Sequence, residues 1–371
     1  MYIRTLRAVT AAGALIATLA GCAPIEADTR VAVTQDASTC ELSQTTVIAG
    51  VTTFAITNVG DTTAEFYILR TNDGGIVSEV ENITAGLSRE LTVELSEGAY
   101  TYSCEQMDGG EPLRGELTVT ASNAAVETDP TVEKAIADYT AFVLSEAEIL
   151  QQKTSEFAAA VTAGDEELAR ALYAPTRVHW ERIEPVAESF GDIDPKIDAR
   201  EGDLPEGTPW TGWHALEKQL WITGLDGTSA ALAEQLVADT RDLVERIGTV
   251  ELTITQMGNG AKELLDEVAT GKVTGEEERY SHTDLWDFEA NIFGAQTVLD
   301  VTRDVLAAND PELLADLDAA FAALNAELDV HRSGNGFVLY TELTTDEVAK
   351  LAALVESVSE PLAGLAAALI K

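Results

Sequence analysis

The spacing of apolar positions changes once along the chain. Between residues 40 and 121, apolar and polar residues alternate in short runs such as "TVIAGVTTFAIT" and "RGELTVTA", separated by turn-forming stretches such as Asn-Asp-Gly-Gly at 72–75. Alternation with a period of two is typical of strands that bury one face. Several such strands without crossover helices between them predict a β-sandwich over residues 39–121.

After residue 130, apolar residues recur every three or four positions, which predicts helices. Asp129 and Pro130 fit the cap and first position of a helix that ends at Gly164. A second helical segment is predicted over residues 166–190. Later helices are predicted over residues 210–224, 229–257, 260–271, 282–308, 311–330 and 345–369. The fold class is therefore two domains, β then all-α, with a linker at 122–130 and a helical bundle over 131–371.

The first 22 residues have the pattern of an export signal. Arg4 and Arg7 precede an apolar run that is too short for a good membrane span and ends in "LAGC". That ending resembles the bacterial lipobox, so we expect Cys22 to carry lipid and to anchor the protein at the outer face of the cell membrane. An ordinary secretory signal is the alternative. Residues 23–38 are polar and Ala-rich, which predicts a tether.

The charge of the chain limits its ligands. Its 64 acidic and 23 basic residues give a net charge of −41. Such a field repels nucleic acid and anionic lipid headgroups and attracts cations, although an acidic surface also serves solubility. If Cys22 carries lipid, Cys40 and Cys104 are the cysteines that remain. In an oxidising compartment such a pair is expected to form a disulfide.

The stretch "GWHALEKQLW" contains the first candidate site. In a helix, His214 and Glu217 share a face with Trp213 and Trp221, and that face is predicted to be buried. A buried carboxylate needs a cation or strong donors, and an imidazole with a carboxylate suits iron, zinc or manganese. His-x-x-Glu is common by chance, however. On pattern alone, a His–Glu hydrogen bond or an Arg partner inside the core is slightly favoured.

The stretch "RVHWERIEPVAE" contains further candidates. Glu181 and Glu184 are neighbours on a helix, but Arg177 and Glu188 extend the same stripe. On spacing alone we expect a solvated charged face. His179 lies among apolar positions, which is more typical of a core histidine than of a metal ligand.

A third stretch, "YSHTDLWDFEANIFGAQ", places two acids on one helical face. Asp284 and Asp287 share this face with Asn291. Ser281 and Asp284 fit a capping box, which offers a structural role for Asp284. Asp287 lies inside the predicted helix beside Trp286, so it is the stronger candidate.

Three long segments carry a resemblance to a known family. "RVHWERIEPVAESFGDIDPKID", "EGDLPEGTPWTGWHALEKQLW" and "YSHTDLWDFEANIFGAQ" resemble the signature stretches of the EfeO family. The resemblance covers most of residues 131–371. It implies an imelysin-like helical bundle with a His-x-x-Glu motif, preceded by a cupredoxin-like β-sandwich.

The resemblance also implies a function. The protein would be the extracytoplasmic iron-binding lipoprotein of an EfeUOB-type uptake system, taking Fe²⁺ or Fe³⁺ and passing it to a membrane permease. It would work with a secreted haem peroxidase, and copper or zinc are alternative ions. The implied site contains His214 and Glu217. The acids in the matching stretches complete it as candidate ligands: Glu181, Glu184, Asp284 and Asp287.

The cupredoxin resemblance predicts a copper site of two His, one Cys and one Met. This chain has no His before residue 179, so such a centre is not expected in the β domain. A structural disulfide between Cys40 and Cys104 is the favoured interpretation. The alternative is an altered soft-metal site, as proposed for the family, formed by Cys40, Cys104, Met107 and Glu65.

Two other functions fit parts of the sequence. The imelysin-like domain is described as a peptidase domain, but zinc peptidases of the HExxH type need two His at i and i+4. Here His214 is followed by a Glu at i+3, with no second His nearby. Binding of an acidic polysaccharide is the other alternative, and the charge of the chain would then require a bridging divalent ion. Enzymatic activity is therefore not favoured.

Overall fold

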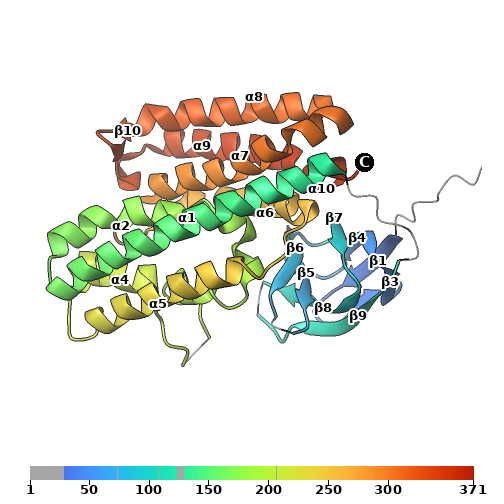
Figure 1. Ribbon diagram of the computed structural model, residues 1–371, viewed down its shortest axis with the longest axis horizontal. Coiled ribbons are helices and arrows are strands. Elements are labelled where there is room, and N and C mark those ends of the chain that lie inside the picture. The colour runs from blue at the N-terminus through green and yellow to red at the C-terminus, as the bar shows by residue number, and fades with distance from the viewer. Residues whose placement is uncertain (1–28, 73, 108, 123–128, 206) are drawn as a thin grey trace, which may run out of the picture.

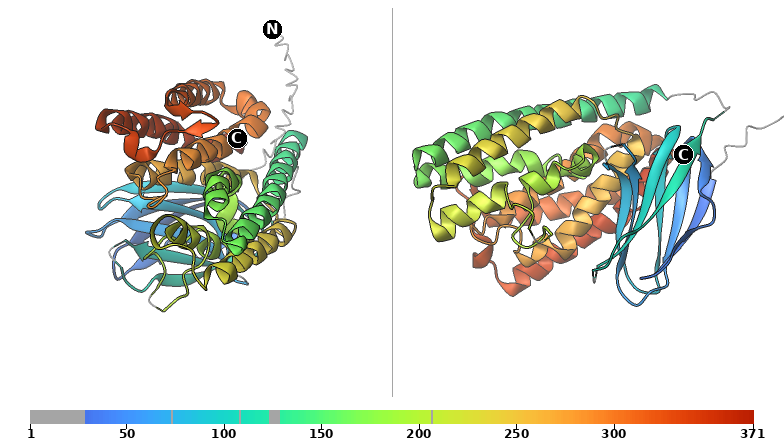
Figure 2. Two further views of the ribbon diagram at one scale, coloured as in Figure 1. Left: turned by 90° about the vertical axis from the view of Figure 1, so that its left-hand side faces the viewer. Right: turned by 90° about the horizontal axis from the view of Figure 1, so that it is seen from below.

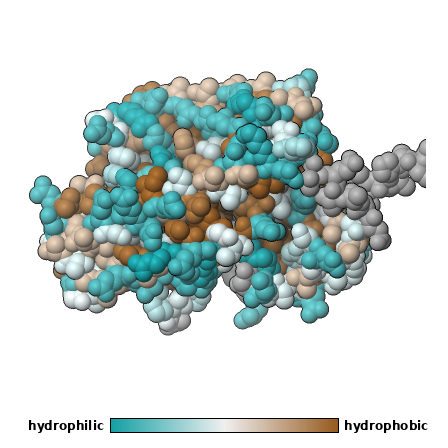
Figure 3. Space-filling model, viewed as in Figure 1, coloured by the Kyte–Doolittle hydropathy of each residue, from teal (hydrophilic) through white to brown (hydrophobic). Residues whose placement is uncertain are grey.

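A computed structural model describes residues 29–72, 74–107, 109–122, 129–205 and 207–371. It contains a β-sandwich beside an elongated helical bundle (Figure 1). The predicted order, β then all-α, is confirmed. The predicted signal peptide and the lipidation site Cys22 lie outside the described residues. On the face shown in Figure 3, hydrophilic residues predominate and apolar patches lie near the middle.

The β-sandwich consists of two sheets with strand orders β2-β1-β4-β7 and β3-β9-β8-β5-β6. Strand β1 pairs parallel with β4, and β3 pairs parallel with β9. Alternating residues such as Phe54, Ile56 and Phe66 are fully buried between the sheets. The strands are β1 (Thr29–Gln35), β2 (Cys40–Leu42), β3 (Thr46–Ile48), β4 (Gly50–Asn58), β5 (Ala64–Arg70), β6 (Ile76–Ile83), β7 (Ser88–Leu95), β8 (Gly98–Gln106) and β9 (Leu113–Thr120).

The prediction of a tether over residues 23–38 is wrong for its second half. Residues 29–35 form β1, which aligns with β4 over its whole length. Val31 and Val33 alternate with exposed residues and are buried in the core. Two buried valines are enough to give the segment a sheet face, despite its polar composition.

The bundle has two layers of helices. Helix α1 packs on α2 and α5, while α6 packs on α7 and α9, and α8 packs on α7 and α9 (Figures 1 and 2). The long helices are α1 (Pro130–Ala163), α2 (Glu166–Glu181), α5 (Ser229–Ile247), α6 (Ile254–Thr270), α7 (Asp284–Asn309), α8 (Pro311–Leu328) and α9 (Thr345–Leu362). Shorter elements are η1 (Glu184–Phe190), α3 (Asp194–Ile197), α4 (Trp213–Lys218), η2 (Gln219–Thr223), η3 (Lys272–Thr274), η4 (Asp329–His331), β10 (Arg332–Ser333), β11 (Gly336–Phe337), η5 (Tyr340–Glu342) and α10 (Leu365–Leu369).

Several predicted helix boundaries differ from the structure. The segment 229–257 is two helices, because α5 ends before Gly248 and a capping box of Thr253 and Gln256 starts α6. The helix predicted from residue 210 begins only at Trp213. The preceding Gly212 has a φ of 86°, and a Cβ there would lie 2.1 Å from a carbonyl oxygen of Ile197. Only glycine allows the chain to turn into α4 at this point.

Among the described residues, the segment Thr345–Leu369 is long and apolar enough to cross a membrane. In the structure it is α9 and α10, separated by a break at Ala363 and Gly364. Both helices pack against α6, so we interpret the segment as part of the bundle core.

The β-sandwich is docked on the bundle through α6 and η1. Asn259 of α6 donates hydrogen bonds to Ser78 Oγ at 2.8 Å and to the carbonyl oxygen of Thr92 at 2.9 Å. On η1, the carbonyl oxygen of Ser189 accepts a hydrogen bond from Arg70 at 2.6 Å. These contacts set β6 and β7 beside α6, and β6 also beside η1 (Figure 1).

Candidate metal centre

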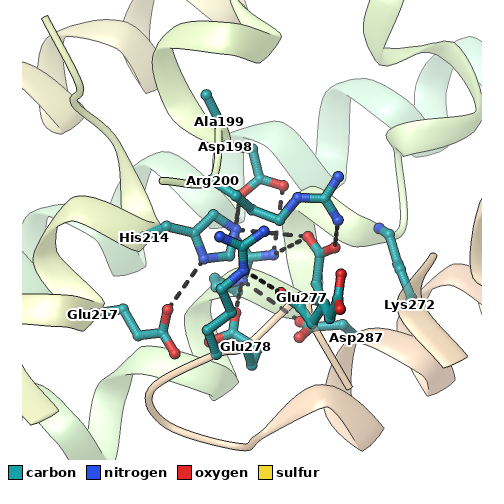
Figure 4. Close-up of polar contacts among 12 residues, drawn as sticks. Asp198, Ala199, Arg200, His214, Glu217, Lys272, Glu277, Glu278 and Asp287 are labelled. Atoms are coloured by element: carbon teal, nitrogen blue, oxygen red, sulfur yellow. Dashed lines mark hydrogen bonds and ion pairs between the residues drawn. The ribbon is translucent and has the colours of Figure 1, made fainter. Parts of the chain in front are cut away.

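His214 lies in the interior of the bundle, on the first turn of α4. Its side chain is 2% exposed, and Nδ1 lies 3.3 Å from Glu217 Oε2. On the other side of the ring, Nε2 lies 3.5 Å from Asp198 Oδ1 and 3.6 Å from Glu277 Oε1 (Figure 4). Asp198 follows α3, and Glu277 lies in the loop between η3 and α7. Segments far apart in sequence therefore meet at one imidazole.

Two groups of side chains in the described residues have the spacing of metal ligands. One is Asp198, His214 and Glu277, and the other is His214, Glu217 and Glu278. Within each group, the ligand atoms lie within 4.8 Å of one another, and all the residues are buried. Metal–nitrogen and metal–oxygen bonds of about 2.0–2.2 Å place ligands a few ångströms apart. Small side-chain movements would let an ion bind to either group, and both groups include His214.

A fully buried arginine lies next to these ligands. Arg177 is 0% exposed, and its guanidinium is surrounded by carboxylates. Its partners are Glu181, Asp198, Glu277, Glu278 and Asp287. Although burial opposes it, the attraction of these carboxylates raises the pKa of Arg177 well above its usual value. The guanidinium therefore keeps its charge and compensates part of the acidic cluster.

A buried lysine holds the predicted ligands Glu181 and Glu184. Lys272 Nζ lies 3.0 Å from Glu181 Oε2 and 2.9 Å and 2.8 Å from the two Glu184 oxygens. Asn291 Nδ2 donates to both carboxylates, at 3.0 Å and 2.6 Å. Neither acid belongs to the two ligand groups.

The expected solvated face around Arg177 and Glu181 is therefore wrong. Both residues are fully buried, because this side of α2 packs against α7. Charged residues at helical spacing looked like a surface stripe, but each charge has a partner inside the protein. The side chain of Glu188 lies outside the described part of the structure. The prediction for His179 is confirmed: its Nδ1 pairs with Glu146 at 2.6 Å, away from the centre.

The two acids of α7 lie around the centre but outside both ligand groups. Asp287 is 1% exposed, and its Oδ1 is 3.6 Å from Arg177 Nε. Asp284 Oδ1 accepts a hydrogen bond from the backbone N–H of Glu278 at 3.1 Å, which braces the loop that carries Glu277. The predicted capping box with Ser281 is absent from these residues, because the Ser281 hydroxyl donates to Glu278 instead.

Burial and neighbouring charges shift the proton affinities in opposite directions. Burial and Arg177 both act to lower the pKa of His214, but the neighbouring carboxylates of Glu217, Glu277 and Asp198 prevail and raise it to about 9. Burial alone would raise the pKa of Glu277, yet Lys272 and His214 hold it well below its usual value. Glu277 is therefore an ionised carboxylate next to the imidazole, as a candidate metal ligand should be.

Other acids in the cluster resist ionisation. Burial raises the pKa of Glu184, Glu278 and Asp287 well above the usual range. The cluster also contains Glu181, Asp198, Glu217, Glu277 and Asp284, so eight carboxyl groups surround two fully buried cations, Arg177 and Lys272. A metal cation would favour the ionised form of these carboxyl groups.

Comparison with known proteins agrees with the two-domain architecture. A sequence model of the family Imelysin matches residues 135–365, and a model of the cupredoxin-like domain matches residues 9–119. "Iron uptake system component EfeO" of Escherichia coli (strain K12) is 40% identical over 342 residues, which cover 91% of this chain and 90% of that protein. The protein of the same name from Shigella flexneri has the same identity and coverage. The chain belongs to the EfeO family.

The sequence analysis missed three residues of the centre in this EfeO-family chain: Asp198, Glu277 and Glu278. Asp198 is the last residue of the matching stretch that begins at Arg177, so the resemblance contained a signal for it. Glu277 and Glu278 lie in "GEEERYSH", which looks like a solvated loop. Its burial depends on the ion pairs with Arg177 and Arg200, which no local pattern predicts.

In the cupredoxin-like domain, Cys40 and Cys104 form a disulfide that joins β2 to β8. This is the interpretation favoured from the sequence. The alternative soft-metal site is not formed, because neither sulfur is a free thiolate. Met107 is 61% exposed, and Glu65 accepts a hydrogen bond from the Tyr67 hydroxyl at 2.6 Å.

Proposed function

We propose that this chain is the extracytoplasmic iron-binding component of an EfeUOB-type uptake system and that it holds iron at His214. One observation carries the proposal. His214 Nε2 is buried and makes no hydrogen bond with any described residue, yet it faces Asp198 and Glu277 at 3.5 Å and 3.6 Å. A buried polar atom without a hydrogen bond is costly, and a metal ion would bind it together with both carboxylates.

The chemistry of the ligands suits iron. One imidazole and several carboxylates form a mixed nitrogen and oxygen set that accepts Fe²⁺ or Fe³⁺, and zinc binds similar sets. The relatives named above are iron uptake system components, which favours iron as the cargo. Copper would be favoured by soft sulfur ligands, and the cysteines of the β domain are bonded to each other.

The surrounding charges suit reversible binding. Arg177 contacts ligands of both groups, so it neutralises part of their charge when no ion is bound. An empty site without such a cation would be strongly destabilised by carboxylate repulsion. The protein can then release iron to a membrane permease and remain folded. Lipid anchoring through Cys22 and cooperation with a secreted haem peroxidase complete the proposal.

The alternatives have less support. Each ligand group contains one His, so the described residues do not assemble the two-His site of a zinc peptidase of the HExxH type. An acidic polysaccharide would have to enter a site whose ligands are buried, which does not suit a polymer.

Equilibrium dialysis against Fe²⁺ under anaerobic conditions, Fe³⁺-citrate, Zn²⁺ and Cu²⁺ tests the assignment. His214→Ala should weaken iron binding at least about 100-fold, since even residues that only support a ligand contribute 10–100-fold. His331→Ala is the matched control, because His331 is also buried but lies on η4 beside Glu327. Equal iron affinity in wild type and His214→Ala would refute the proposed site.

A further inference from the structure

A cavity of about 420 Å³ lies between the two domains. Nine of the 17 residues that line it are Asp or Glu, and one, Arg200, is basic. A water molecule occupies about 30 Å³, so the cavity has room for a metal ion that keeps waters of hydration. Nine acids around an aqueous cavity create a strongly negative potential that concentrates cations.

The side of this cavity formed by Asp198 and Glu277, here called its inner end, adjoins the His214 centre. Asp198 and Glu277 line the cavity and also lie on either side of His214 Nε2. That nitrogen is buried and has no hydrogen-bond partner among the described residues. It faces the two carboxylates that the cavity exposes, so an ion arriving there lies next to a nitrogen that could become a ligand. Figure 4 shows Asp198, Glu277 and Arg200 grouped on this side of His214.

Both domains build the walls. Glu79 and Glu81 lie on β6 of the β-sandwich, whereas Glu263 and Glu267 lie on α6 of the bundle. The hydrogen bonds of Asn259 to the β-sandwich hold the two walls together. The basic residue Arg200 bonds to Glu277 at 2.8 Å and to Asp203 at 3.1 Å, so its charge sits at the inner end. The rest of the lining contains six more acids and no other basic residue.

We propose that this interdomain cavity is an outer binding site for a hydrated divalent cation, through which the ion reaches His214. The inference rests on the proposed function and extends it to the β-sandwich, which supplies Glu79 and Glu81. In the outer site, carboxylates attract the ion through its hydration shell. At the inner end, Asp198, Glu277 and His214 replace water ligands. The β-sandwich would then take part in metal uptake through these two carboxylates.

The first test compares two double variants of the full chain by stopped-flow fluorescence with Fe²⁺ under anaerobic conditions. Trp180 Nε1 donates to Asp198 Oδ2 at 2.9 Å, so its fluorescence should report binding at the inner end. Glu79→Gln/Glu81→Gln should lower the association rate constant about tenfold, as loss of electrostatic steering does. The control Glu41→Gln/Glu116→Gln removes the same charge from exposed positions of the same domain and should change it less than twofold. Equal rates in the two variants would overturn the proposal.

The second test is the stoichiometry of Fe²⁺ in equilibrium dialysis. Wild type should bind one ion tightly and a second ion weakly. Glu79→Gln/Glu81→Gln should lose the weak ion and keep the tight one, whereas His214→Ala should do the reverse. A weak ion retained in the Glu79 and Glu81 variant refutes the outer site alone, and a tight ion retained in His214→Ala refutes the proposed function alone. If the double variant unfolds, Glu263→Gln on the opposite wall serves the same test.

Discussion

The two domains hold their candidate metal ligands in different ways. In the β-sandwich, Cys40 and Cys104 are joined covalently, so neither sulfur is available to an ion. In the bundle, His214, Asp198 and Glu277 are held by ion pairs and hydrogen bonds. Such contacts can exchange for contacts to a metal, whereas a disulfide requires a reductant first. Of these two sets of side chains, the one in the bundle could exchange its contacts for a metal ion, and the cysteine pair could not.

The placement of charge differs as well. The pair Arg30 and Glu90 of the β-sandwich is more than half exposed on both sides, and such pairs contribute little to stability. Arg177 and Glu181 of the bundle are fully buried, where desolvation is costly. A protein of net charge −41 could leave all its acids in water. Burial of seven carboxyl groups in one place therefore indicates a function other than stability.

The largest effect is expected when the buried cation is removed. Arg177→Met should lower the free energy of unfolding of the metal-free protein by about 5 kcal/mol, because several buried carboxylates lose their partner. Urea unfolding followed by circular dichroism measures this loss. Arg303→Met removes a partly exposed arginine of α7 that pairs with Asp300 and Asp318, and should cost at most about 1 kcal/mol.

Addition of Fe²⁺ provides a second comparison of Arg177→Met with Arg303→Met. The ion should restore part of the stability that Arg177→Met loses, since it also compensates the carboxylates. It should have no such additional effect on Arg303→Met. If the two variants were equally stable without metal, Arg177 would not have the compensating role assigned to it.

A somewhat smaller effect is expected in the β-sandwich. Cys40→Ser/Cys104→Ser should lower the stability of this domain by about 4 kcal/mol, as chain-entropy models give for a loop closed across 64 residues. Thermal unfolding measures the loss. Iron affinity at His214 should stay within twofold of wild type. A parallel loss of iron binding would show that the sulfur atoms contribute to the site and would erase the distinction between the domains.

Much of the fold could be predicted because its signals are local. Asp129 and Gly164 mark the two ends of α1, and both cap the helix as expected. The alternation around Phe54 marks a strand in the same way. The segment of β1 was missed because its two valines lie in a polar, Ala-rich region. Its strand conformation depends on pairing with β4. Pairing between distant segments leaves no local pattern.

The centre could be predicted only where it lies within one helical turn. His214 and Glu217 were found because their spacing places them on one face of α4. Asp198 and Glu277 were missed because they lie outside regular helices and reach His214 through tertiary packing. Glu181 was interpreted as solvated because its partner Lys272 lies 91 residues away. Sequence identifies candidate ligands well, but their convergence depends on the packed structure.

The smallest effect is expected from proton exchange at His214. The pKa of its ring is raised to about 9, so the protonated imidazole stabilises the metal-free fold. Relative to an unfolded pKa of about 6.5, this contribution is fully present below pH 6.5 and is lost as the pH rises through 9. Wild type should therefore lose up to about 3 kcal/mol relative to His214→Gln between these pH values. Urea unfolding of both proteins with a chelator, in steps across this range, measures the difference.

Two parallel pH profiles would mean that His214 is neutral in the folded protein and that its neighbouring carboxylates do not hold a proton there. The β-sandwich, which has no histidine, should show the same profile in both proteins when its unfolding is followed separately.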